Sequence, residues 1–130
     1  VGSEMCIRDR LVSKKKDFIG KRSLNRSAFT STDREKLVGV VPIDKTTSIP
    51  EGSYIVKDPK AKLPNPKLGH VSASCWSVEY DNPFSLAIIK DGKNMIGQKL
   101  FAMSPLKNKT IPVEIVSSHY VDPEGKRVRA

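Results

Sequence analysis

The chain has 130 residues, which suits one domain with a core of its own. No apolar run approaches the ~18 residues that a membrane-spanning helix needs, and no basic segment followed by an apolar stretch marks a secretory signal. We therefore expect a cytoplasmic protein without a membrane partner. The formal net charge of +9 favours anionic partners. Nucleic acid is not favoured among them, because only 6% of the residues are aromatic and no expected strand mixes aromatic with basic side chains.

The positive charge is concentrated near the start of the chain. Residues 11–30 hold six Lys or Arg against the single carboxylate of Asp17. A smaller basic run lies between residues 57 and 67, in a segment expected to be a loop. The simplest interpretation is a solvated surface. A basic surface also attracts polyanions, such as nucleic acid, an acidic protein or a polyglutamylated cofactor.

The residues that most often carry catalysis or bind metals are few. Cys6 and Cys75 are the two cysteines, and His70 and His119 are the two histidines. One distant cysteine pair is not a disulfide framework, so a reducing compartment is expected. None of the four has a neighbour at metal-ligand spacing, and no phosphate-binding or nucleophile motif occurs. We expect neither a metal site nor a catalytic residue in this chain.

The chain divides into three parts. Residues 1–10 show no periodicity and resemble a translated sequencing or assembly scar, so they are left out of the fold prediction. Residues 11–33 are expected to be a short helix and a linker. Asp17 is the expected N-cap of that helix, and residues 25–33 are expected to be a loop. Residues 34–130 are expected to form one β domain.

Six short β-type runs follow residue 36 at regular spacing, bounded by Gly, Pro and Asp. No convincing amphipathic helix separates them, which disfavours a parallel α/β sheet. The pattern predicts an all-β sandwich or barrel. In the last run, Pro112 predicts an edge position or a bulge. The runs cover residues 37–41, 53–57, 68–77, 84–90, 98–103 and 111–118.

The third run contains a candidate interface. Successive side chains of a strand point to opposite faces, which places Val71, Ala73 and Cys75 toward the core. The other face is polar and carries a Trp, as is typical of a surface that meets another domain. We expect an interface made by that face and by one aromatic residue after the last run: His70, Ser72, Ser74, Trp76 and Tyr120.

Six segments, taken in order and spacing, resemble the C-terminal part of the aminomethyltransferase (glycine-cleavage T-protein) family. The resemblance extends over residues 16–130 and is greatest to the sarcosine oxidase α-subunit branch. Cys75 stands where an aromatic residue is usual and His119 where Phe is usual. The subgroup therefore stays open between sarcosine oxidase, a dimethylglycine-type dehydrogenase and the T-protein. The segments are residues 17–24, 34–39, 50–56, 69–77, 85–90 and 120–127.

The resemblance implies a small six-stranded antiparallel barrel that closes the end of an upstream folate-binding module. It implies a parent complex that uses tetrahydrofolate with flavin and NAD, demethylates sarcosine to glycine and transfers the one-carbon unit to the folate. The fragment itself would be structural, would form a wall of the folate site and would bind no cofactor alone. Its partners would be the upstream domains and the other sarcosine oxidase subunits.

Two further expectations concern binding. Lys126, Arg127 and Arg129 are candidate contacts for the glutamate end of folate, because cationic side chains suit carboxylates. The alternative is a stand-alone basic β-barrel that binds nucleic acid or a protein partner.

Overall fold

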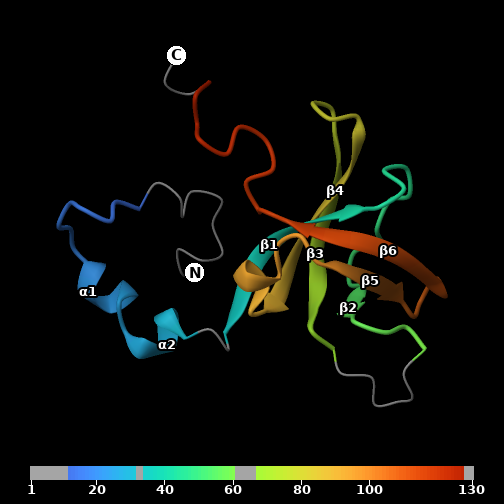
Figure 1. The fold of residues 1–130 in the computed structure, drawn as a ribbon, viewed down its shortest axis with the longest axis horizontal. Helices are drawn as coiled ribbons and strands as arrows, with labels where there is room; N and C mark the ends of the chain where they lie inside the picture. The colour runs from blue at the N-terminus through green and yellow to red at the C-terminus, as the bar shows by residue number, and fades with distance from the viewer. Residues whose placement is uncertain (1–11, 32–33, 61–66, 128–130) are drawn as a thin grey trace.

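Six antiparallel strands close into a barrel in the computed structural model, which describes residues 12–31, 34–60 and 67–127 (Figure 1). Their order around the barrel is β1-β4-β3-β2-β5-β6, with β6 pairing again to β1. The predicted six-stranded antiparallel barrel is therefore confirmed. The strands are β1 (Glu35–Pro42), β2 (Tyr54–Val56), β3 (Gly69–Ser77), β4 (Asn82–Lys90), β5 (Lys99–Ser104) and β6 (Lys109–Val116).

The core fills the barrel with aliphatic side chains from all six strands. In β6, Ile111, Val113 and Ile115 are buried while the residues between them are exposed, as the period-two pattern requires. The loop before β2 adds Ile49, and the 3₁₀ helix η3 (Gly92–Met95) adds Met95. The other members of this cluster are Val38, Val40, Ile55, Val71, Ala87, Ile89, Leu100 and Ala102.

Pro112 lies in a strand that has neighbours on both sides, so the predicted edge position is wrong. It pairs with Phe101 of β5, whereas the pairing of β6 with β1 ends at Val113. Its carbonyl accepts the Ile43 N–H at 3.0 Å. The N–H and C=O of an extended residue point to the same side, so the N–H that Pro112 lacks would point toward β1. Because β1 has already ended at this position, no hydrogen bond between the two strands is lost.

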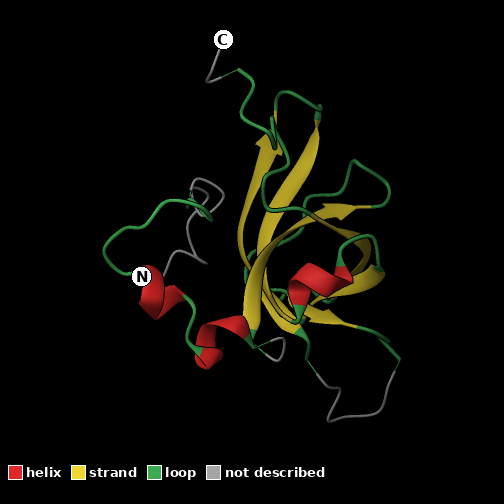
Figure 2. Cartoon of the chain, turned by 60° about the vertical axis from the view of Figure 1, so that its left-hand side comes forward, coloured by secondary structure: helices red, strands yellow, loops and turns green. Residues whose placement is uncertain are grey.

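Two single-turn helices precede the barrel and lie beside it (Figure 2). Helix α1 (Lys21–Leu24) begins after Gly20, so the predicted cap at Asp17 is wrong. Helix α2 (Ser27–Thr30) occupies part of the segment predicted to be a loop. Two cations hold α2 against the start of β1: the Lys36 Nζ donates to the Phe29 carbonyl at 2.9 Å, and Arg34 donates to the Ala28 carbonyl at 3.1 Å.

Within the described ranges, no helix has the length and apolar character needed to cross a membrane. The suspected scar at residues 1–10 lies outside these ranges.

Replacing Gly69 tests how closely β3 and β4 approach. A Cβ at Gly69 would lie 2.0 Å from the Ile88 carbonyl oxygen, a backbone atom that cannot move alone. We expect Gly69→Ala to lower the free energy of unfolding by about 3 kcal/mol or more, because the strands must separate. Gly97→Ala is the control. It has φ +88 and open space around the added Cβ, so its cost should be about 1 kcal/mol. Urea unfolding measures both, and equal losses would contradict the steric explanation.

Candidate functional site

A bulge in β3 changes which of its side chains face the core. Val71 pairs with Ala87, and Ala73 already pairs with Leu86, so Ser72 is an extra residue on β3. An inserted residue reverses the inside–outside alternation beyond it. Val71 is fully buried, as predicted, but Ala73 and Cys75 are exposed. The prediction that these two lie on the core side is therefore wrong.

Ser74 is turned inward by the same bulge, so its predicted place on the outward face is wrong. Its hydroxyl donates to the Ile49 carbonyl at 2.6 Å and lies 2.9 Å from the hydroxyl of Ser85, which is buried. Its backbone N–H donates to the Glu51 carboxylate at 3.3 Å. Ser74 thus ties the loop before β2 to the barrel.

The other predicted interface residues of β3 are accessible. His70 and Ser72 are exposed, and Trp76 is 53% exposed. Trp76 lies near the end of the long β3–β4 hairpin, which projects beyond the barrel (Figure 1). Val78 and Tyr80, in the turn of the hairpin, are exposed as well. The hairpin thus presents three large apolar side chains to solvent. An interface role for these residues stays a prediction.

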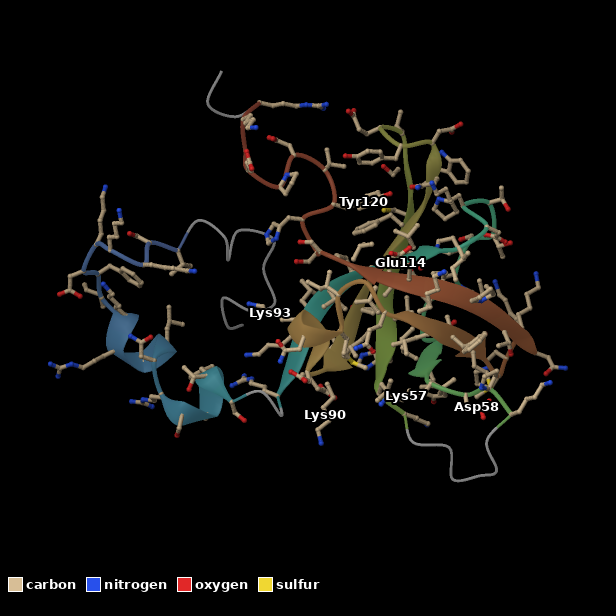
Figure 3. The ribbon with its side chains drawn as sticks, viewed as in Figure 1. Lys57, Asp58, Lys90, Lys93, Glu114 and Tyr120 are labelled. Atoms are coloured by element: carbon tan, nitrogen blue, oxygen red, sulfur yellow. The ribbon has the colours of Figure 1, made fainter. Side chains whose placement is uncertain are left out.

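Tyr120 belongs to the tail that follows β6 and is half-buried against the hairpin (Figure 3). Its ring stacks on Phe84 at 4.9 Å between centroids and meets Tyr80 at 4.6 Å. Its hydroxyl accepts a hydrogen bond from the buried Asn82 amide at 3.2 Å. Tyr120 therefore anchors the tail to its own barrel.

A groove of about 370 Å³ lies between this tail and the outer face of the hairpin. The exposed thiol of Cys75 lies on one wall, and His119 and Tyr120 lie on the other. Phe84 and Val121 add apolar surface. The sequence did not predict this groove, because Cys75 faces it only as a result of the bulge in β3.

The tail ends in a turn that orients its basic residues. The Gly125 N–H donates to the Asp122 carbonyl at 2.9 Å, and the Asp122 carboxylate accepts the backbone N–H groups of Lys126 and Arg127. The Arg127 guanidinium pairs with Glu79 in the hairpin, and the Lys126 ammonium lies 2.8 Å from Glu124. These two candidate folate contacts thus already face carboxylates. Arg129 lies outside the described residues.

Charge pairing with Arg127 changes the acidity of Glu79. The hydrogen bond from the guanidinium, together with its positive charge, lowers the pKa of the Glu79 carboxyl from its ordinary value of 4.5.

Among the described residues, no group of three or more His, Cys, Asp or Glu is placed to hold a metal ion.

Residues 35–122, which include all six strands, match the family described as "Glycine cleavage T-protein C-terminal barrel domain". The chain belongs to this family. The resemblance inferred from the sequence is thereby confirmed.

Two related proteins give the finer relationship. The sarcosine oxidase subunit alpha of Rhizobium meliloti (strain 1021) is 35% identical over 115 residues, which are 88% of this chain. That of Corynebacterium sp. (strain P-1) is 36% identical over 119 residues, or 90% of this chain. In both cases the match spans only 12% of the relative's own length.

The fold recurs in a solved structure, the glycine cleavage system aminomethyltransferase T from Bartonella henselae. It aligns with a TM-score of 0.58 at 17% sequence identity, covering 82% of this chain and 27% of that one.

The hydrogen bond between Tyr120 and Asn82 has a measurable contribution. Tyr120→Phe keeps the ring stack but leaves the buried Asn82 amide without this acceptor. We expect the free energy of unfolding to fall by about 1–2 kcal/mol, the usual cost of an unsatisfied buried donor. Tyr80→Phe is the matched control, because the Tyr80 hydroxyl makes no hydrogen bond within the described part of the chain. A similar loss in both variants would show that the hydroxyl bond is not responsible.

The ion pair between Glu79 and Arg127 predicts a pH dependence of the tail. A lowered folded-state pKa contributes stability above the unfolded pKa of about 4.5, and this contribution disappears as pH falls through the folded value. We therefore expect the contact between tail and hairpin to weaken as the solution is acidified below about pH 4.5. A carboxyl NMR titration should give Glu79 a pKa below its ordinary value, and Arg127→Gln should restore it. An unchanged Glu79 pKa in that variant would refute the assignment.

Proposed function

We propose that this chain is the C-terminal barrel domain of a sarcosine oxidase α subunit. The parent protein would oxidise sarcosine to glycine and transfer the released one-carbon unit to tetrahydrofolate, with flavin and NAD bound elsewhere in the complex. The observation that carries the proposal is the identity of 35–36% with two such subunits over 88–90% of this chain. Identity at this level over nearly the whole chain distinguishes this proposal from one based on the shared fold alone.

The role of the domain within the parent would be structural. The six strands close into a ring, and the β3–β4 hairpin continues beyond it, so the barrel is a compact support that can bear on a neighbouring domain. The projecting hairpin supplies the surface for that contact, with Trp76 at its end and His70 and Ser72 farther along the same strand. Upstream domains of the same chain and other oxidase subunits are the proposed partners. Ser74 is half-buried, and its hydroxyl faces inward toward Ile49 and Ser85, so it would contribute little to this surface.

Contacts with the glutamate end of folate would involve Lys126, Arg127 and Arg129. Lys126 and Arg127 are exposed, and both already lie beside a carboxylate of the chain. A folate carboxylate would take the place of Glu124 or Glu79 in these pairs. The exchange of one carboxylate for another conserves the type of interaction, so we expect it to add little affinity. A wall near the folate is accordingly the larger proposed contribution.

The alternative is a stand-alone basic barrel that binds nucleic acid or a protein, and it depends on the net charge of +9. Its affinity for nucleic acid would fall steeply with salt. The high identity with the oxidase subunits favours the first proposal, since a basic charge alone specifies no partner.

A chimera tests the proposal in a complete enzyme. The 115-residue segment of the Rhizobium meliloti α subunit that aligns with this chain would be replaced by the corresponding residues of this chain and produced with the other oxidase subunits. We expect an assembled complex that oxidises sarcosine and, with tetrahydrofolate present, forms methylenetetrahydrofolate in place of free formaldehyde. Gel filtration measures assembly, and product analysis measures transfer.

A pair of substitutions makes the chimera informative about the hairpin. Trp76→Lys should weaken assembly, because it places a charge in the proposed contact. Leu106→Lys is the matched control, since Leu106 is 96% exposed in the turn between β5 and β6. If the chimera fails to assemble although circular dichroism shows that the 130-residue chain folds, the proposal is wrong. If Leu106→Lys is as harmful as Trp76→Lys, the hairpin is not the contact surface.

A further inference from the structure

A hollow of about 480 Å³ lies between the N-terminal segment and the barrel. Four lysines line it: Lys14 and Lys21 from the segment, Lys36 from β1 and Lys93 from η3. Figure 3 shows Lys93 on the side of the barrel that faces α1 and α2. Among the described residues, no carboxylate lines the hollow.

Two of these ammonium groups are held in place by backbone oxygens. The Lys21 Nζ donates to the Lys16 carbonyl at 2.8 Å, and the Lys36 Nζ donates to the Phe29 carbonyl at 2.9 Å. A hydrogen bond to a carbonyl orients an ammonium group without changing its charge. Ser13 and Asn25 add polar groups to the same wall.

The hollow continues beyond Lys14 and Lys93. Both lysines also line an adjoining space of about 450 Å³ that reaches Ser118 and His119 at the start of the tail. Lys14 and Lys93 therefore lie where the two spaces meet, one on the segment and one on the barrel. Several like charges on the walls of one concave space produce a positive potential that concentrates anions.

We propose that this hollow binds a small multivalent anion, a ligand with two or more carboxylate or phosphate groups. A single anionic group can approach only part of a site whose lysines come from two separate parts of the chain. A ligand with several groups can engage Lys14 or Lys21 and Lys93 at the same time, through charge-assisted hydrogen bonds. Such a ligand also joins the N-terminal segment to the barrel. The proposal rests on the hollow alone and not on the proposed parent enzyme.

The enclosing walls favour a small ligand over a polymer. A nucleic acid follows an extended basic surface, and its bases stack on exposed aromatic side chains. Here the lysines line one concavity. Its lining holds one exposed aromatic residue, Phe18, too few for successive bases to stack, while Phe29 is half-buried beneath the Arg34 guanidinium at 4.4 Å from its ring centre.

Calorimetric titration of the 130-residue chain at low ionic strength tests the proposal, with tripolyphosphate and pentaglutamate as separate probes. We expect saturable one-to-one binding that weakens as salt is added. The double variant Lys14→Gln/Lys93→Gln should weaken it at least about tenfold, because two charge-assisted contacts are lost. The stronger of the two probes shows whether phosphate or carboxylate groups suit the site. Binding of either probe should also shift the backbone amide NMR signals of Ser13 and Asn25.

The matched control is Lys107→Gln/Lys109→Gln, which removes the same charge in the turn between β5 and β6 and at the first residue of β6. When the titration is repeated at an ionic strength of about 0.15 M, where the Debye length is about 8 Å, this control should change the dissociation constant less than about twofold, because distant charges are then screened. An equal loss in both double variants would show a diffuse attraction and overturn the site. An absence of saturation up to about 1 mM of both probes would overturn it as well. So would tighter binding of a single-stranded dodecanucleotide that both variants weaken equally.

Discussion

Closure of the barrel depends on β1, which pairs with β4 on one side and with β6 on the other. Gly39 is paired on both sides, with Leu86 of β4 on one and Val116 of β6 on the other. A Cβ at this position would lie 2.6 Å from the Ser117 carbonyl oxygen and 2.7 Å from the Phe84 ring. The missing side chain therefore lets the end of β6 and the Phe84 ring approach β1 together.

That approach determines where the C-terminal tail lies. Because the chain leaves β6 beside Phe84, only a few residues separate Ser117 from the stack between Tyr120 and Phe84. Beyond the stack, the Asp122 turn brings Arg127 to Glu79. The tail and the hairpin thus form one unit, with an aromatic contact at its base and an ion pair farther out. The exposed ion pair contributes little to stability, so the aromatic contact carries most of the attachment.

The sequence predicted the strands well because each strand is short, apolar on one side and bounded by turn residues. The fourth run, Phe84 to Lys90, lies within β4. The antiparallel barrel came from the resemblance, and the order of the strands around it was not predicted. The bulge at Ser72 could not be predicted in this way. Ser suits either face of a strand, and the residues around Ser72 are small, so a shift of one position leaves no clear mark in the pattern. Because of that one inserted residue, Ser74 faces inward and Cys75 faces outward, the reverse of the prediction.

The candidate sites depend on contacts between distant parts of the sequence, which a local pattern does not contain. The excess of lysine in residues 11–30 was visible in the sequence, but the hollow also requires Lys36 and Lys93 from the barrel. His119 lines the space next to that hollow and also the groove beside Tyr120. The start of the tail is therefore a wall common to a cationic surface and an aromatic one. A movement of the tail that breaks the Tyr120 stack would therefore change the lining of the groove and that of the space next to the hollow together.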